Sequence, residues 1–279
     1  MSEAGRSPLR INVVTIFPAF FEVPLSLSIP ARARAAGSVE FRLVDLRDFT
    51  HDRHRTVDDA PFGGGPGMVM KAAPFFEAVA HLGAVAPIVL LSPRGKRFDQ
   101  ADALRLAAGT ELTLLCGHYK DVDQRVADHL ATEELSLGDF LLSGGEPAAL
   151  AIVDAVVRLL PGAMSDHDSA YGDSFYGRGL SAPSYTRPAE YRGHGVPEVL
   201  LSGNHKRIAE WREWEGRRLT ARRLGLPEPV PDPPQRKRRR AAPRAALEGE
   251  RPDGGGSNDT RSGEAAAPPL GAAEKPPAA

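Results

Sequence analysis

The chain has 279 residues, of which 42% are hydrophobic, and this is enough for one large core or two smaller ones. Its single cysteine, Cys116, excludes an intramolecular disulfide, and no apolar run approaches the roughly 18–20 residues that a membrane span needs. No signal peptide is recognisable, so we expect a protein of the reducing cytoplasm without a membrane partner. The net charge of −1 favours no particular class of ligand.

The first part of the chain alternates between predicted strands and helices. The stretch LGDFLLSGG, residues 137–145, is predicted as a short apolar strand that ends in a glycine turn before a helix. Alternation of this kind indicates an α/β fold with a mainly parallel sheet. The other predicted strands are residues 10–17, 39–46, 87–93 and 111–117, and the predicted helices are residues 73–83, 99–109, 121–131 and 146–162.

The composition divides the chain into four parts. We expect an α/β domain over residues 1–165, a polar, glycine-rich and flexible linker over 166–187, and a short helical domain over 188–226. Residues 227–279 are rich in Pro, Ala, Gly and charge and contain almost no large apolar residues. Such a segment cannot bury enough surface to fold, so we expect a disordered tail there.

Three glycine-containing turns follow predicted strands, at residues 90–95, 114–119 and 137–145. Because ligands bind at the carboxyl ends of the strands in an open parallel sheet, the three turns are expected to converge on one pocket. The alternative is that each glycine only permits a tight turn. A further glycine-rich loop, residues 58–70, has no Gly-Lys-Ser/Thr after its glycines and is therefore not a nucleotide-binding P-loop.

Two charged residues are candidates for chemistry. Arg158 interrupts the apolar end of a predicted helix and needs either an anionic partner or an exit to water. Asp173 lies in the polar linker, where a carboxylate either acts as a general base or only stabilises a turn. Residues 205–223 hold seven Lys or Arg against three Glu, which indicates either a phosphate-binding surface or a solvated helix. The eight histidines show no spacing typical of a metal site.

Longer motifs extend from about residue 10 to residue 212. They are DFTHDRHRTVDDAPFGGGPGMVM, LSPRGKRFDQ, CGHYKDVDQRV, LSLGDFLLSGGEPA, VVRLLPG, DSF, YTRP and VPEVLLSGNHKRIAEWR. In this order, they resemble the motifs of the bacterial tRNA (guanine-N1)-methyltransferases of the TrmD type. The resemblance implies a deep trefoil knot in the α/β domain, S-adenosyl-L-methionine as cofactor, and a homodimer with its active site at the subunit interface. It also implies that the substrate is tRNA, bound through its anticodon stem-loop and methylated at N1 of guanosine 37.

The resemblance further implies roles for single residues. Asp173 would act as the general base that takes the proton from guanine N1, and Arg158 would stabilise the charge that grows on O6. Asn204, His205 and Arg207 would contact the tRNA. The residues implied to hold S-adenosyl-L-methionine, largely through backbone groups, are Pro93, Gly117, Tyr119, Leu137, Gly138, Asp139, Phe140, Leu141, Leu142, Gly144 and Gly145.

Two features depart from the best-known members of this family. His118 and Lys120 stand where those members have Arg and Glu, and because a lysine does not bind Mg²⁺, a requirement for Mg²⁺ is left open. The C-terminal domain is also shorter than in those members. Two other functions are compatible with the sequence: a related knotted methyltransferase that acts on another RNA atom, such as a ribose 2′-hydroxyl, and an RNA-binding protein without catalytic activity.

Overall fold

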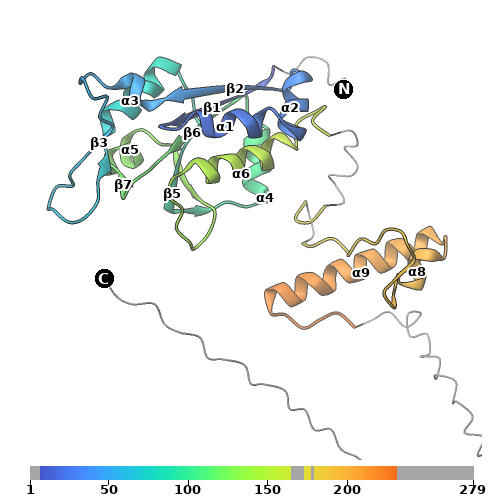
Figure 1. Ribbon diagram of the computed structural model, residues 1–279. Coiled ribbons are helices and arrows are strands. Elements are labelled where there is room, and N and C mark those ends of the chain that lie inside the picture. Colours follow the sequence, from blue (N-terminus) through green and yellow to red (C-terminus); the bar gives the residue numbers. More distant parts are fainter. Residues whose placement is uncertain (1–6, 165–172, 177–178, 231–279) are drawn as a thin grey trace, which may run out of the picture. The chain divides into compact units, whose positions relative to one another are not determined.

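The computed structural model describes residues 7–164, 173–176 and 179–230 (Figure 1). The chain divides into two units, residues 1–230 and residues 231–279, and the described residues all belong to the first. The predicted disordered tail therefore lies almost entirely outside the described residues, as does part of the predicted linker. Among the helices that the structure describes, none is long and apolar enough to cross a membrane.

A parallel sheet forms the centre of the α/β region (Figure 1). All four pairs of neighbouring strands are parallel, so the predicted α/β fold with a mainly parallel sheet is confirmed. Every residue of the central strand β6 is buried, because this strand has a neighbour on each side and helices on both faces. The strands, in their order across the sheet, are β2 (Val39–Asp45), β1 (Leu9–Thr15), β6 (Glu111–Cys116), β5 (Ile88–Arg97) and β8 (Glu133–Ser136).

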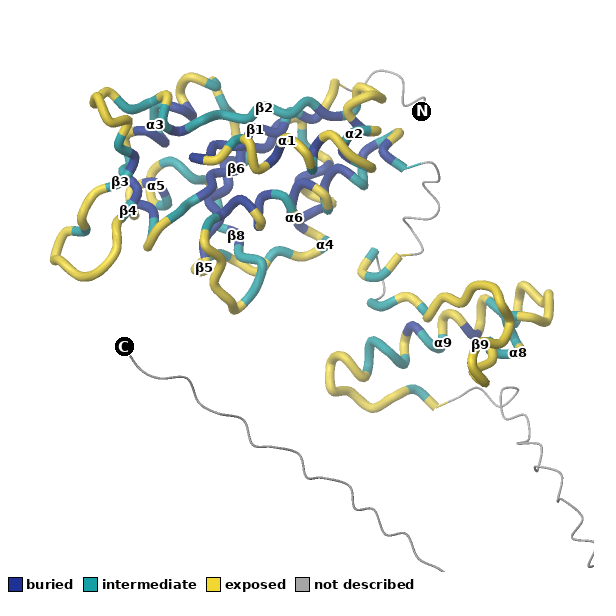
Figure 2. Tube along the Cα trace, in the orientation of Figure 1, coloured by how far each residue is buried: buried dark blue, intermediate teal, exposed yellow. Residues whose placement is uncertain are grey.

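Helices cover both faces of this sheet and form two buried clusters. The strands supply alternate residues to them, so that Ile11 and Val13 belong to the first cluster and Val14 to the second. Figure 2 shows how the buried residues concentrate in β1, β6 and α6. The helices of the first cluster are α1 (Ala19–Leu25), α2 (Ser28–Ala35), α4 (Gln100–Ala107) and α6 (Glu146–Val157), and those of the second are the 3-10 helix η1 (Leu46–Phe49), α3 (Ala72–Leu82) and α5 (Gln124–His129).

A smaller sheet carries the glycine-rich loop. It has the strand order β3-β4-β7, where β3 is Asp58–Asp59, β4 is Val69–Met70 and β7 is Asp121–Val122. The loop between β3 and β4, residues 60–68, is mostly exposed and projects from the α/β region (Figure 2). Because β7 follows the turn that ends β6, this sheet holds the loop next to the carboxyl end of a central strand.

Residues 179–230 contain a short hairpin and two helices. These elements are β9 (Glu190–Tyr191), β10 (His194–Gly195), α8 (Glu198–Leu201) and α9 (His205–Leu224). Asn204 begins α9, because its side-chain oxygen accepts a hydrogen bond from the backbone N–H of Arg207 at 3.2 Å. Gly225 ends α9 in the left-handed conformation. Most of the basic side chains of α9 are exposed.

Most elements expected from the sequence are confirmed, and α6 does follow the glycines at 144–145, but the strand predicted within residues 137–145 is wrong. The strand of this region is β8, which ends at Ser136, and irregular chain follows it. The apolar residues that made the stretch resemble a strand are exposed, Phe140 by 56% and Leu141 by 84%. The prediction of a helix from residue 121 is wrong at its start, because Asp121 and Val122 pair with β4. The helices α1 and α2 are not predicted from the sequence, and Pro24 interrupts the pattern of α1.

Asp102 connects α4 to the end of β5 through ion pairs. Its side chain is 5% exposed and lies 2.9 Å from Nζ of Lys96 and 3.3 Å from Nη2 of Arg105. Burial alone would raise the pKa of Asp102, but the hydrogen bonds from Lys96 and Arg105 outweigh burial, so the pKa is lowered. The carboxylate therefore stabilises the folded state in its charged form.

We expect Asp102→Asn to reduce the free energy of unfolding at neutral pH by about 1–3 kcal/mol. Because the pKa of Asp102 is lower in the folded protein than its ordinary value of 3.8, the wild type loses this contribution as the pH falls below that value. Urea unfolding of the wild type and of Asp102→Asn, at neutral pH and at about pH 3, measures how much the carboxylate stabilises the protein at each pH. A deficit of the same size at both pH values would contradict this assignment. Asp48→Asn, which removes an exposed carboxylate paired with Arg55, is the control and should change little.

Candidate active site

A cavity of about 340 Å³ opens where β6 and β8 end and where β5 leaves its pairing with β8 after Leu91. It is lined by residues 90–93, 117–122 and most of 135–145, so the predicted convergence of three stretches on one pocket is confirmed. The prediction that residues 90–95 form a turn after a strand is wrong, because they lie within β5, and Gly95 does not line the cavity. Its volume falls in the range of about 300–1,000 Å³ that is typical of small-molecule sites. The edge of a parallel sheet at the carboxyl ends of its strands is also where such sites are usually found.

Glycines bring the backbones of two of these stretches into contact. The N–H of Gly145 donates a hydrogen bond to the carbonyl of Gly117 at 2.8 Å. A Cβ atom at Gly145 would lie 2.9 Å from Cα of Cys116, and one at Gly117 would lie 2.7 Å from a methyl group of Val122. Only residues without a side chain fit here, and they leave backbone donors and acceptors close to whatever fills the cavity.

One wall of the cavity is apolar. Phe140, Leu141 and Leu142 line it, and all three side chains are substantially exposed. Tyr119 lines it as well, with a positive φ of 60° that is uncommon for a bulky residue. Backbone strain of this kind costs roughly 1–3 kcal/mol and tends to occur at functional sites. The wall suits a flat, apolar ring such as a nucleobase.

A buried polar pair that the sequence analysis missed lies behind the cavity. Glu146 is the first residue of α6 and is 3% exposed, and its carboxylate accepts a hydrogen bond from the Thr15 hydroxyl at 2.7 Å. The signal for it was a carboxylate placed directly after two glycines, in the first turn of a predicted helix. Burial, together with the nearby charge of Glu146, raises the pKa of Cys116 well above its ordinary value. Cys116 is therefore a neutral thiol at physiological pH rather than a nucleophile.

Of the residues implied to hold the cofactor, Asp139 is the one that does not line the cavity. Its side chain is 93% exposed, and its carboxylate accepts a hydrogen bond from Arg97 at 2.8 Å. His118, which the sequence analysis noted only as a departure from the family, does line it. The His118 ring lies edge-on to Phe17 and Tyr119, and among the described residues its buried Nδ1 has no hydrogen-bond partner.

The structure brings Arg158 and Asp173 together. Arg158 directly follows α6, and its Nη2 donates a hydrogen bond to Oδ2 of Asp173 at 2.7 Å. The side chains are 32% and 44% exposed, so the pair contributes little to stability. The sequence left open whether Arg158 has an anionic partner or extends into water. In the structure, Asp173 is its anionic partner.

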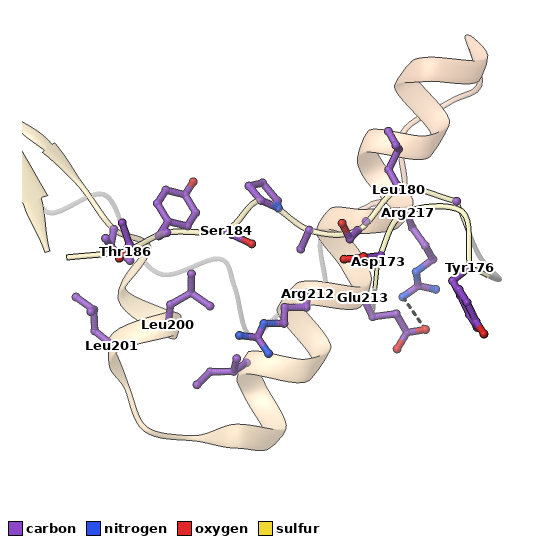
Figure 3. Close-up of a pocket in the computed structure, with 18 of the residues that line it drawn as sticks. Asp173, Tyr176, Leu180, Ser184, Thr186, Leu200, Leu201, Arg212, Glu213 and Arg217 are labelled. Atoms are coloured by element: carbon purple, nitrogen blue, oxygen red, sulfur yellow. Dashed lines mark ion pairs between the residues drawn. The ribbon is translucent and has the colours of Figure 1, made fainter. Parts of the chain in front are cut away.

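Asp173 also lines a second, wider cleft of about 1490 Å³ (Figure 3). Residues 179–187 form one side of this cleft, and α8 and α9 contribute to it. Figure 3 shows Arg212, Glu213 and Arg217 extending from α9, with Arg217 and Glu213 4.0 Å apart. Exposed arginines in a wide cleft suit a ligand that carries phosphate groups.

Comparison with known proteins identifies the family. Residues 9–228 match the family described as "tRNA (Guanine-1)-methyltransferase TrmD". The chain belongs to this family. The resemblance inferred from the motifs is therefore confirmed, and the match covers nearly all of the described residues.

Individual relatives support this assignment, and each is named tRNA (guanine-N(1)-)-methyltransferase. The protein of Geobacillus kaustophilus is 51% identical over 215 residues, which are 76% of this chain and 88% of the relative. That of Bordetella pertussis is 53% identical over 226 residues, 77% of this chain and 88% of the relative. That of Gloeobacter violaceus is 50% identical over 226 residues, 80% of this chain and 99% of the relative. The matched region covers nearly the whole length of this last relative.

Proposed function

We propose that this protein is a tRNA (guanine(37)-N1)-methyltransferase, which transfers a methyl group from S-adenosyl-L-methionine to N1 of the guanosine next to the anticodon. The names of the relatives supply the substrate and the atom. The observation that carries the proposal is the ion pair between Arg158 and Asp173, because the reaction needs a carboxylate and a cation side by side. A related knotted methyltransferase acting on another RNA atom is the alternative.

The cavity fits the proposed cofactor. Phe140 and Leu141 offer an apolar surface to adenine, while the glycines at 117 and 145 let the backbone of the turns lie close to the ligand. Fixed backbone donors and acceptors bind a ligand without loss of side-chain freedom. When bound, S-adenosyl-L-methionine supplies a methyl group on a positively charged sulfur, which is a good leaving group.

Asp173 acts as the general base in this proposal. N1 of guanine carries a proton, so its electron pair is not available to form a bond to carbon. A carboxylate oxygen of Asp173 accepts that proton, and the freed electron pair forms the new N1–methyl bond while the carbon–sulfur bond breaks. Because the side chain of Asp173 is 44% exposed, a guanine ring can approach its carboxylate.

Arg158 stabilises the charge that this proton transfer creates. Loss of the N1 proton places negative charge on O6 of guanine. Nη2 of Arg158 is directed at Asp173, and a guanidinium has further N–H groups on its other nitrogens that can donate to O6. One side chain thus orients the base and stabilises the anion, which is a preorganised electrostatic contribution.

The proposed substrate requires a basic surface and, by family resemblance, a second subunit. Asn204, His205 and Arg207 lie at the start of the exposed helix α9, where they are available to an anticodon stem-loop. Phe20 and Val23 on α1 are 44% and 65% exposed, and apolar exposure of this kind supports a homodimer interface. We include in the proposal that the active site forms at this interface and that the α/β region carries the trefoil knot.

The direct test is methyl transfer to two tRNA transcripts that differ at one position. One has guanosine at position 37 preceded by another guanosine, and its twin has adenosine at 37. With labelled S-adenosyl-L-methionine, we expect transfer to the first only, and nucleoside digestion should give 1-methylguanosine. Equal labelling of both transcripts, or label on a ribose, would favour the alternative methyltransferase. Tight binding of tRNA without any transfer would favour an RNA-binding protein without catalytic activity.

A further inference from the structure

Lys120 places a positive charge at the wall of the cavity. It follows Tyr119 and precedes β7, and its backbone N–H donates a hydrogen bond to the carbonyl of Met68 at 3.0 Å. Its side chain lies along the glycine-rich loop, since a Cβ atom at Gly67 would lie 3.1 Å from Cβ of Lys120. The position of a Cβ at Gly65 is 3.6 Å from Nζ. The side chain of Lys120 thus lies along the loop up to its ammonium group, while the residue as a whole is exposed.

The charge of Lys120 is not neutralised by the side chains around it. Lys120 and Asp121 carry the formal charges among the residues that line the cavity. Arg94 binds Asp121 with nitrogen–oxygen distances of 3.0 and 3.1 Å, so that carboxylate already has a cation. In the part of the chain that the structure describes, no carboxylate forms an ion pair with Lys120. Because Arg94 neutralises Asp121, the positive charge of Lys120 is left over, and it is complementary to an anion.

We propose that Lys120 binds the carboxylate of the methionine part of S-adenosyl-L-methionine, an inference that rests on the proposed function. The cofactor is an adenosine with an amino acid at its other end. Its adenine suits the apolar side chains of Phe140 and Leu141, which leaves the charged amino-acid end for the cation among the lining residues, Lys120. A lysine ammonium is a flexible point charge with three donors and suits a single carboxylate.

Calorimetric titration with two ligands tests this inference. S-adenosylhomocysteine carries the carboxylate, while methylthioadenosine has the same adenosine and sulfur but lacks the amino acid. We expect Lys120→Met to weaken binding of S-adenosylhomocysteine by roughly fivefold to tenfold, as for a partly exposed ion pair. Binding of methylthioadenosine should change by less than about twofold. Met keeps an unbranched stem against Gly67, so loss of loop packing is not part of the expected effect.

Lys120→Arg is the matched control and should keep most of the affinity for S-adenosylhomocysteine. Equal weakening of both ligands by Lys120→Met would assign Lys120 a structural role and overturn the inference. Unchanged binding of both would overturn it as well. If the wild type binds neither ligand, the proposed function fails instead, and the two failures are therefore distinguishable.

Discussion

Asp173→Asn is expected to lower the single-turnover rate of methyl transfer by roughly 10²–10⁴, the usual contribution of a positioned general base. Asparagine has nearly the same shape, and its amide oxygen can still accept the hydrogen bond that Arg158 donates at 2.7 Å. It cannot take up the proton from guanine N1. The loss should therefore appear in the rate, while the affinities for S-adenosyl-L-methionine and for tRNA change little.

The experiment needs saturating cofactor and excess enzyme, so that the chemical step is observed rather than product release. Glu40→Gln is the control, because it also removes an exposed carboxylate that pairs with an arginine, Arg42 at 3.0 Å. Full activity of Asp173→Asn would eliminate Asp173 as the base. A loss of cofactor affinity that accounts for the whole effect would show that Asp173 acts on binding rather than on proton transfer.

The sequence allows the sheet and the cavity to be predicted for a clear physical reason. Buried parallel strands are continuous apolar runs, and glycines after them mark the points where the backbone turns at the edge of the sheet. The three stretches at residues 90–95, 114–119 and 137–145 do line one cavity. Apolar residues on an exposed loop, such as Leu141, give the same pattern as a strand, and for this reason residues 137–145 were mispredicted.

Contacts between distant residues are the part that the sequence pattern does not contain. Thr15 and Glu146 are 131 positions apart, and their hydrogen bond depends on β1 and α6 being packed together. The pairing of Arg158 with Asp173 was likewise undecided by pattern alone, because a snorkelling arginine and a turn aspartate look the same in sequence. Their roles came from family resemblance, whereas the structure adds their contact.

Gly95→Ala is expected to lower the free energy of unfolding by more than about 3 kcal/mol, beyond the usual cost of one extra methylene in a core. A Cβ atom at Gly95 would lie 2.5 Å from the backbone carbon of Glu134 and 2.5 Å from the nitrogen of Leu135. Carbon atoms in good contact are about 3.5–4.0 Å apart. The three nearest atoms all belong to the backbone of β8, so the overlap with them is not relieved by rotation of a side chain.

The strands β5 and β8 cannot separate without breaking the hydrogen bonds between them. β5 pairs with β8 on both sides of an irregularity, since Leu91 and Lys96 both pair with Leu135. Beyond it, the N–H of Phe98 donates a hydrogen bond to the carbonyl of Ser136 at 2.8 Å. The residues between the two pairing points leave the ladder, and Gly95 directly precedes Lys96, where pairing resumes.

Thermal unfolding measures the effect, and a loss of this size should lower the melting temperature by roughly 6–12 °C or more. Gly195→Ala is the control, because a Cβ atom there meets nothing within 4 Å and should change stability by less than about 0.5 kcal/mol. Equal melting temperatures for Gly95→Ala and the wild type would contradict the prediction. They would show that the backbone of β8 can shift to accommodate the methyl group at little cost in free energy.

Gly95→Ala should also distort the cavity and reduce its affinity for a ligand. Ser92 and Pro93 line it, and they belong to the stretch of β5 that leaves the ladder before Gly95. A methyl group that pushes β5 away from β8 displaces this wall relative to Leu137, which lines the cavity from the other side of the contact. If the Gly95→Ala protein is soluble, we therefore expect its affinity for S-adenosylhomocysteine to fall together with its stability. The close contact between the backbones of β5 and β8 maintains both the stability of the fold and the shape of the cavity.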